Sequence, residues 1–451
     1  MPLHRVAPTL EWWALDGSGL RQGTLTSTAQ GASRRARSIY WPAPPTTTSM
    51  RCSIRTALTL WLLAIGPVLA LRCANAPLFD AFGKPGDDAQ KCSGAQVVAT
   101  KSALCVWGIC GGGAGVVNRT VWLRKSTDWG TTWLAPVPQP HLGAGDLGQF
   151  IYDPKTDTIL SMSPPPGPFP RGGPCLPSPG CAQPFSCMSK STDDGTSWTI
   201  AEAVGCHTEN QTGSTGEGCG GITLSTGDIL APAGRKTGAG NFVIISQDSG
   251  RTWKMGNATP PLPSKQAWGE AMVAELANGS VVLTSRLSGV RKTPHWEFLP
   301  IQRGFSISHT GGRTWAKSWS FPADQPFDRN FGPGYNVEHG LASAHNRTRL
   351  VLSKPTATLR GDSSGKRPAC GPHTQGSCAY RRNLTVASST DGGASWAIEP
   401  WGLIYKGRAA YSDLVELPNG QIAVVFERSN SSLEEYRYVS VAVVTPSWLP
   451  R

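Results

Sequence analysis

This sequence lacks three features that would point to other classes of protein. Helix signals are almost absent from its 451 residues, which favours an all-β fold. No run of lysine and arginine with interleaved aromatic residues occurs, so we expect no nucleic-acid partner. No Cys-x-x-Cys pair and no His/Cys spacing typical of zinc occurs, so we predict neither a metal site nor a cofactor.

The composition is that of a turn-rich globular protein. Hydrophobic residues make up 39% of the chain and charged residues 16%. The 52 glycines and 37 prolines suit many short strands joined by turns. The formal net charge of +12 favours anionic ligands.

One eight-residue pattern, Ser-x-Asp-x-Gly-x-x-Trp, occurs five times at intervals of 55 to 81 residues. The copies begin at Ser126, Ser191, Ser246, Ser308 and Ser389. Thr310 replaces the aspartate in the fourth copy. Such spacing predicts an array of similar supersecondary units, none of which can bury its apolar face alone.

Each copy of this box predicts a hairpin. Aspartate accepts hydrogen bonds from nearby backbone N–H groups, and glycine adopts a positive φ without steric cost. The tryptophan then packs back over the turn, and its indole N–H needs an acceptor. We interpret the boxes as scaffold without a catalytic role.

Met50 opens a pattern typical of a secretory signal peptide. Arg51 and Arg55 supply a basic segment, residues 57–71 an apolar one, and residues 74–76 the small-x-small cleavage site Ala-Asn-Ala. An uncleaved signal-anchor is the alternative, because the apolar run is short for a membrane span. We therefore expect the secretory pathway, with an extracellular, lysosomal or membrane-attached location; a membrane contact follows only if the signal is uncleaved.

Three segments follow from this pattern. Residues 1–49 are rich in Ser, Thr, Pro and Arg and show no sustained periodicity, which predicts a disordered extension upstream of the true start. Residues 50–76 form the signal peptide or signal-anchor. Residues 77–451 form the β-rich domain.

The cysteines and the glycosylation sequons are consistent with secretion. Ten of the twelve cysteines lie outside the predicted signal, and their spacing suggests disulfide-stapled loops. The close sets are Cys206/Cys219, Cys370/Cys378 and the cluster Cys175, Cys181, Cys187. Sequons occur at Asn118, Asn210, Asn257, Asn278, Asn346, Asn383 and Asn430. Asn383 is expected in a strand and therefore unmodified.

Residues 268–286 read as a strand, an Asn-Gly turn and a second strand. Glu270 begins this hairpin and Arg286 ends it, so both side chains can face one cleft. Glu275 lies beside the turn, and we expect it to be exposed.

Two later segments carry comparable side chains. Residues 410–427 form a second hairpin around an Asn-Gly turn, with Tyr411 and Glu427 at its two ends. Residues 380–386 lead into the last box and contain Arg381 and Arg382.

Together, the boxes and these segments resemble the exo-α-sialidase (neuraminidase) family of Asp-box β-propellers, over roughly residues 95–426. The resemblance implies an all-β fold with blades of four antiparallel strands around an axis. Five boxes plus the terminal strands predict a six-bladed β-propeller, with the first blade closed by a strand from the C-terminal end.

The resemblance also assigns roles to site residues. It implies that Glu270 activates Tyr411 as the catalytic nucleophile. Arg286 and Arg381, with Arg382 as the fallback, would grip the substrate carboxylate. Glu427 would steady the first arginine of the carboxylate-binding triad.

These residue types suit one substrate class, the terminal α-linked sialic acids and related 2-keto sugar acids of glycoproteins, glycolipids and oligosaccharides. The anomeric carbon of sialic acid carries a carboxylate, so an anionic nucleophile would be repelled. A neutral tyrosine activated by a glutamate avoids this repulsion. Guanidinium groups bind carboxylates through paired hydrogen bonds, which lysine cannot form.

The first blade departs from the family pattern. Cys92 stands where the family has the first arginine of the carboxylate clamp, and Lys91 is the nearest cation. The loop at residues 109–119, where the family has its general-acid aspartate, contains no acid. Upstream candidates for the acid are Asp80, Asp87 and Asp88.

Three hypotheses follow. The chain is a secreted exo-α-sialidase, a glycoside hydrolase, although loss of a general acid typically costs about 10²- to 10⁴-fold in rate. Alternatively, it is a sialidase-like lectin that binds sialylated glycans with little or no turnover. The third alternative is a non-catalytic Asp-box propeller. The Glu270–Tyr411 pair favours the enzyme, and the missing arginine and aspartate favour the lectin.

Overall fold

The computed structural model places much of the chain. The residues it describes are 10–16, 19–25, 78–83, 91–111, 119–142, 147–163, 176, 184–206, 213–214, 218–235, 240–262, 267–288, 303–320, 339–355, 382–430 and 437–449. They fall into two compact units, Met1–Val68 and Leu69–Arg451.

In the first unit, β1 (Leu10–Asp16) pairs antiparallel with β2 (Gly19–Leu25). An isolated two-stranded hairpin is only marginally stable in water. The rest of that segment and the signal at residues 50–76 lie outside the described residues, and the three predicted segments stay predictions. Among the residues that the structure describes, no helix is long and apolar enough to cross a membrane.

The second unit is built from β-sheets in which all strand pairings but one, in the fourth sheet, are antiparallel among the described residues. These residues contain only one short 3-10 helix, η1 (Pro140–Leu142). The first sheet contains β4 (Lys91–Ala99), β5 (Leu104–Gly111), β6 (Arg119–Ser126) and β7 (Val137–Pro138). The second contains β8 (Gln149–Asp153), β9 (Thr158–Ser163), β10 (Pro184–Ser191) and β11 (Glu202–Cys206). The third contains β12 (Gly213–Ser214), β14 (Ile222–Thr223), β15 (Ile229–Arg235), β16 (Phe242–Ser246) and β17 (Lys254–Met255).

Two further sheets complete this unit. The fourth contains β13 (Gly218–Gly220), β18 (Ala267–Glu275), β19 (Val281–Ser288), β20 (Arg303–Ser308) and β21 (Lys317–Ser320). The fifth has seven strands, β22 (Leu341–Ala344), β23 (Arg349–Pro355), β24 (Arg382–Ser389), β25 (Ala397–Glu416), β26 (Ile422–Ser429), β27 (Tyr438–Val444) and β3 (Leu78–Phe82).

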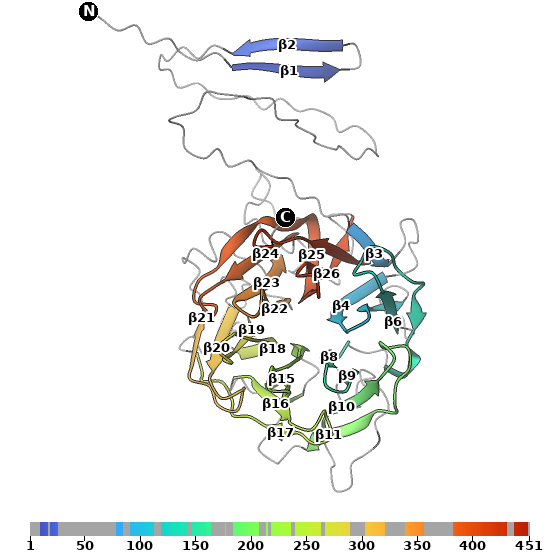
Figure 1. The fold of residues 1–451 in the computed structure, drawn as a ribbon, viewed down its shortest axis with the longest axis vertical. Coiled ribbons are helices and arrows are strands. Elements are labelled where there is room, and N and C mark those ends of the chain that lie inside the picture. The colour runs from blue at the N-terminus through green and yellow to red at the C-terminus, as the bar shows by residue number, and fades with distance from the viewer. Residues whose placement is uncertain are drawn as a thin grey trace, which may run out of the picture. The chain divides into compact units, whose positions relative to one another are not determined.

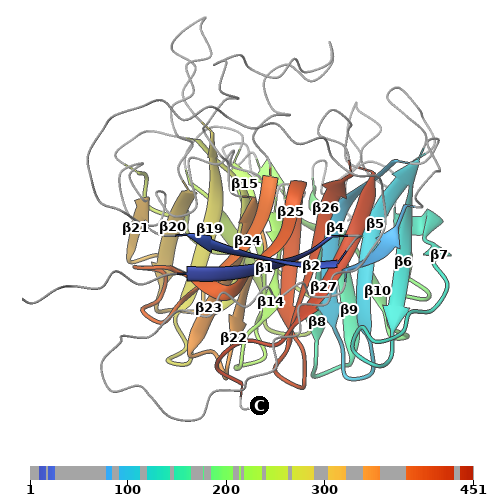
Figure 2. The ribbon, with the colours of Figure 1, turned by 90° about the horizontal axis from the view of Figure 1, so that it is seen from above.

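The sheets of the second unit follow one another around a central axis (Figure 1). In the view from above, their strands run side by side along that axis (Figure 2). A cavity of about 320 Å³ lies between the innermost strands and is lined by β4, β8, β13, β14, β18, β22 and β25. The unit is therefore all-β with a propeller-like arrangement, as the resemblance predicts.

The ring is closed in a different way from the prediction. The first sheet, β4 to β7, contains only residues 91–138 and receives no C-terminal strand. Instead, the N-terminal strand β3 pairs antiparallel with β27 at the edge of the last sheet. The prediction of a C-terminal strand in the first blade is wrong, because β3 precedes β4 in the chain and covers the otherwise open edge of β27.

Apolar side chains fill the spaces between neighbouring sheets. Trp107 of the first sheet stacks on Phe150 of the second, with ring centroids 4.0 Å apart. Val98, Val121 and Ile159 join the same buried cluster. Strands with both faces against other sheets need apolar residues at successive positions, and β16 (Phe242–Ser246) is buried throughout.

Each of the five boxes joins two consecutive antiparallel strands, as predicted for hairpins. These pairs are β6–β7, β10–β11, β16–β17, β20–β21 and β24–β25. In the second copy, Ser191 Oγ accepts a hydrogen bond from the Gly195 amide at 2.8 Å, and Asp193 Oδ1 accepts one from the Ser197 amide at 2.9 Å. Asp194 and Gly195 have φ values of 55° and 78°. The Asp193 side chain thus accepts a hydrogen bond from a backbone N–H group of the turn, and Gly195 adopts a positive φ without steric cost.

The fourth box retains this geometry with threonine. Thr310 Oγ1 accepts a hydrogen bond from the Thr314 amide at 2.9 Å, and Ser308 Oγ accepts one from the Gly312 amide at 2.9 Å. A hydroxyl can therefore take over the acceptor role of the carboxylate, although it has one oxygen instead of two.

The described cysteines bear on the disulfide prediction. Cys92 and Cys110 form a disulfide, and Cys187 is disulfide-bonded as well. Cys105 is a buried free thiol, and burial raises its pKa. Of the predicted sets, Cys175, Cys181, Cys370 and Cys378 lie outside the described residues, and nothing is described of the side chains of Cys206 and Cys219.

The described sequons fall into two groups. Asn257, Asn278, Asn346 and Asn430 are exposed. Asn383 lies within β24 with a φ of 57°, and its predicted position in a strand is confirmed.

Candidate active site

The innermost hairpins place the predicted site residues at one end of the sheets. In the fourth sheet, Glu275 pairs with Val281 beside the Asn-Gly turn, whereas Ala267 pairs with Ser288 at the opposite end. Val281 also pairs with Ser308, the first residue of a box. The turns and boxes therefore share one end of the strands, and Glu270 and Arg286 lie towards the other.

Three predicted residues meet at that end. Arg286 Nη1 donates hydrogen bonds to both carboxylate oxygens of Glu270, at 2.8 and 3.0 Å. The Tyr411 hydroxyl donates to Glu270 Oε1 at 3.4 Å, although 141 residues separate the two. The structure thus brings Glu270, Arg286 and Tyr411 together from β18, β19 and β25.

Irregularities in the inner strands coincide with these residues. The register of β18 with β19 shifts between Trp268 and Ala271, around Glu270. The register of β25 with β26 shifts between Ala409 and Ser412, around Tyr411. A β-bulge bends its strand and redirects a side chain, which explains how the two groups leave the regular alternation and face each other.

The electrostatics hold Arg286 charged. Partial burial lowers the pKa of Arg286, but the nearby Glu270 carboxylate and Tyr411 hydroxyl outweigh it and leave that pKa raised. The side chains of Arg286 and Glu270 keep 32% and 21% of their exposure, so a ligand can reach the pair. An oriented cation next to a tyrosine–carboxylate contact can bind an anionic group while the tyrosine loses its proton.

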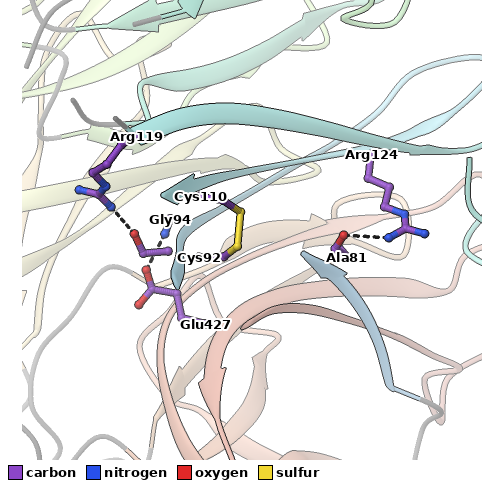
Figure 3. The surroundings of a disulfide bond; sticks show 8 residues. Ala81, Cys92, Gly94, Cys110, Arg119, Arg124 and Glu427 are labelled. Atoms are coloured by element: carbon purple, nitrogen blue, oxygen red, sulfur yellow. Dashed lines mark hydrogen bonds between the residues drawn. A yellow bond between two sulfur atoms is a disulfide. The ribbon is translucent and has the colours of Figure 1, made fainter. Parts of the chain in front are cut away.

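Glu427 lies at the edge of this region. Its side chain is buried, and its Oε1 atom accepts a hydrogen bond from the Gly94 amide at 2.5 Å. Figure 3 shows this contact beside the Cys92–Cys110 disulfide. Glu427 therefore touches the part of β4 where the family pattern has the first arginine.

Cys92 itself cannot bind a ligand. It is fully buried and covalently joined to Cys110 across β4 and β5. Nearby, Arg119 of β6 donates a hydrogen bond from Nη2 to Ser93 Oγ at 2.5 Å. The sequence pattern does not single out this arginine, because the family has an acid and no cation in the loop that corresponds to residues 109–119.

The structure also tests the upstream acid candidates. Asp80 lies on β3, where its carboxylate accepts hydrogen bonds from Arg428 Nη2 at 2.6 Å and from Ser440 Oγ at 2.6 Å. This ion pair links the closing strand to β26 and β27, so Asp80 acts in ring closure. Asp87 and Asp88 lie outside the described residues.

Of the two candidates for the second clamp arginine, the structure describes only Arg382. Arg381 lies outside the described residues, and its role stays a prediction. Arg382 is the exposed first residue of β24.

Glu275 differs from its prediction. It is buried, where it receives a hydrogen bond from Arg347 Nη1 at 2.7 Å and two from Ser225. The expectation of exposure is wrong, because the neighbouring sheets cover the end of the hairpin and supply the partners that a buried carboxylate needs.

The described residues contain no group of three or more His, Cys, Asp and Glu side chains placed to hold a metal ion.

Comparison with known proteins defines the class of this chain. The family of BNR repeat-like domains matches residues 175–424, more than half of the 451 residues. The chain belongs to this family. The match spans four of the five boxes, the hairpin at residues 268–286 and the second hairpin as far as residue 424.

Curated relatives are sialidases at modest identity. The chain is 27% identical to sialidase-4 of Homo sapiens over 304 residues, which cover 51% of this chain and 62% of the human protein. It is 29% identical to a sialidase of Vibrio cholerae serotype O1 over 211 residues, 43% of this chain and 23% of that protein. The chain thus spans less than two thirds of the length of these relatives.

Solved structures show the same fold. The Hadza microbial sialidase Hz136 superposes with a TM-score of 0.53 at 19% identity, covering 81% of this chain and 68% of that structure. A leech intramolecular trans-sialidase superposes with a TM-score of 0.54 at 15% identity, covering 81% and 70%. At these identities the likeness concerns the fold alone.

Proposed function

We propose that this protein is an exo-α-sialidase that removes terminal α-linked sialic acid, or a related 2-keto sugar acid, from glycoproteins, glycolipids or oligosaccharides. One observation carries the proposal: the Tyr411 hydroxyl contacts the Glu270 carboxylate, which Arg286 holds through two hydrogen bonds. A tyrosine next to a fixed carboxylate suits the one glycosidase chemistry that uses a tyrosine nucleophile. The sialidase relatives support the same reading.

The reaction uses these groups in sequence. Glu270 accepts the phenolic proton of Tyr411 as the tyrosine oxygen attacks the anomeric carbon. The C–O bond to the leaving group breaks, and the departing oxygen takes a proton from an acid or from water. Water then attacks the anomeric carbon of the glycosyl–tyrosine intermediate and breaks its bond to the tyrosine oxygen. The water gives one proton to the base that remains after the leaving group was protonated, and Glu270 returns its own proton to the tyrosine oxygen, which releases the sugar acid and restores both groups.

Arg286 binds the substrate carboxylate in this proposal, and Arg381 is the second arginine of the clamp. A carboxylate ligand would compete with Glu270 for the Arg286 guanidinium. Its arrival would loosen the Glu270–Arg286 pair and make the Glu270 carboxylate more available to the Tyr411 proton.

The proposed enzyme has six blades. The N-terminal part of β25 pairs with β24 and its C-terminal part with β26. We infer that the seven-stranded sheet represents two four-stranded blades that share this 20-residue strand. We also propose entry into the secretory pathway through residues 50–76.

A sialic-acid-binding lectin is the second candidate. The buried, disulfide-bonded Cys92 favours it, because the first clamp arginine is absent at that position. Asp80, one candidate for the general acid, is bound to Arg428.

The test is hydrolysis of an aryl α-sialoside by the full-length chain and by Tyr411→Phe. The aryl group leaves readily and needs little acid assistance. Turnover that disappears in the variant, with binding of a sialic acid analogue retained, supports the enzyme. Binding without turnover in the parent chain supports the lectin. Absence of both would reject any sialic acid function.

A further inference from the structure

The carboxylate clamp of the proposed function lacks the arginine that the family pattern places in the first sheet, because position 92 is a cysteine. The disulfide removes Cys92 from the surface, yet Glu427 keeps its place against the neighbouring Gly94 amide. The buried Glu427 carboxylate therefore contacts the segment of β4 in which the family pattern has an arginine and this sequence has Cys92.

The register of the first sheet brings one arginine to this edge. Lys91 of β4 pairs with Gly111 of β5, and Gly111 pairs with Arg119 of β6. Because Gly111 has no side chain, the long Arg119 side chain can cross β5 towards the innermost strand. Its guanidinium reaches Ser93, which lies on β4 beside the ring centre.

The receiving segment has the same irregularity as the rest of the site. The pairing of β4 with β5 shifts between Ser93 and Gln96, in the way that β18 and β25 shift around Glu270 and Tyr411. Gly94 within this bulge has a φ of 69° and donates to Glu427. Arg119, Ser93, Gly94 and Glu427 thus form a continuous edge of the same end of the ring.

We propose that Arg119 supplies the missing cation of the clamp and binds the carboxylate of a sialic acid from the side of the first sheet. This inference rests on the proposed function. Figure 3 shows Arg119 and Glu427 on the same side of the disulfide. Arg119 is exposed and forms no ion pair with the residues that the structure describes, so its planar guanidinium is available to a carboxylate.

Lys91 provides a matched control. It lies at the start of β4 and is only partly exposed. Its ammonium group acts as a single point charge and cannot form the paired hydrogen bonds of a guanidinium with a carboxylate. If general positive charge attracted the ligand, both residues would contribute equally.

The experiment measures binding of a 2,3-unsaturated sialic acid analogue and of its methyl ester by calorimetry. The proteins are the full-length chain and its Arg119→Gln, Arg119→Lys and Lys91→Gln variants. A charge-assisted hydrogen bond contributes enough that Arg119→Gln should weaken binding of the free acid by about 10- to 100-fold. Binding of the ester should change by less than about threefold, and Arg119→Lys should recover part of the loss.

The remaining outcomes overturn the inference in distinguishable ways. If the parent chain binds the free acid better than the ester and Arg119→Gln does the same, Arg119 is a solvated surface residue and the proposed function survives. A selective loss in Lys91→Gln assigns the role to Lys91 instead. If the parent chain binds neither ligand, both the inference and the proposed function are wrong. Unchanged thermal unfolding of Arg119→Gln shows that a loss of binding is not a loss of folding.

Discussion

The two ends of the strands in the second unit differ in how their polar side chains find hydrogen-bond partners. At the box end, serine accepts from the glycine four residues later, and four of the five copies repeat the matching aspartate contact. At the site end, equivalent inner strands present different residues: Ser93 on β4, Glu270 on β18 and Tyr411 on β25. The box end is a repeated local structure, whereas the site end is assembled once.

The two ends also differ in the sequence separation of their hydrogen bonds. Box contacts join residues four apart. The Tyr411–Glu270 contact spans 141 residues, and the Gly94–Glu427 contact spans 333. Boxes can therefore form as soon as their own residues are present, while the site exists only when the ring has closed. Substitutions at the two ends should separate stability from activity.

The largest effect is expected for Glu270→Gln at the site end. An amide cannot take the Tyr411 proton, so turnover of an aryl α-sialoside should fall by about 10²- to 10⁴-fold. The temperature of thermal unfolding should change little, because the glutamine can still accept a hydrogen bond from Arg286. Retained turnover with lost stability would place Glu270 in the scaffold instead.

Asp413 links the last inner strand to the first and should make stability depend on pH. Its carboxylate accepts hydrogen bonds from the Val97 and Leu414 amides, and burial raises its pKa from 3.8 to about 7. The folded chain therefore binds this proton more tightly than the unfolded chain. The stability contributed by protonated Asp413 is complete below pH 4 and is lost as the pH rises through 7, a change on the order of 2–4 kcal/mol.

Box aspartates have the opposite sign. Hydrogen bonds from Thr252 lower the pKa of Asp248, and those from Thr132 lower the pKa of Asp128. Their contribution is present above pH 4 and is lost as the pH falls towards the lowered pKa.

The pH dependence assigned to Asp413 is checked by denaturant unfolding of the parent chain and of Asp413→Asn between pH 4 and 8. The stability difference between the two should shift with pH in favour of the variant as the pH rises, and a constant difference would contradict the assignment.

Glu275 lies in the same strand as Glu270, but Glu275→Gln should lower stability and leave turnover nearly unchanged. Glu275 is fixed by Arg347 and Ser225 at the box end. The substitution weakens these buried contacts and should lower the free energy of unfolding by about 1–3 kcal/mol. Turnover per folded molecule should stay within about twofold of the parent chain, measured well below the unfolding temperature. A larger loss of turnover would connect the two ends of the hairpin.

The smallest effect is expected from restoring the aspartate of the fourth box with Thr310→Asp. A carboxylate can accept from the amide and the hydroxyl of Thr314 with separate oxygens, as Asp248 does with Thr252. We expect a gain of about 0.5–1.5 kcal/mol in stability and no change in activity. Differential scanning calorimetry at neutral pH measures it, with Thr252→Ala as the variant expected to lose stability.

Contacts between residues far apart in the sequence were harder to predict than the local turns. Two strands around each Asn-Gly turn, and a hairpin at each box, follow from local turn chemistry, and the structure confirms them. The meeting of Tyr411 with Glu270 was expected from residue types at matching ends of two hairpins. The burial of Glu275 and the Asp80–Arg428 pair were not, because each depends on which sheet lies next to which.

The amino-acid sequence alone determined the repeated units of this protein, since box residues bond to one another within eight positions. It also determined which hairpins carry Glu270, Arg286 and Tyr411. Only the tertiary structure decided that β3 closes the last sheet, that Cys92 pairs with Cys110, and that Arg119 reaches Ser93 across a glycine. Those contacts join segments whose proximity is set by ring closure and by bulges, and neither leaves a local pattern in the chain.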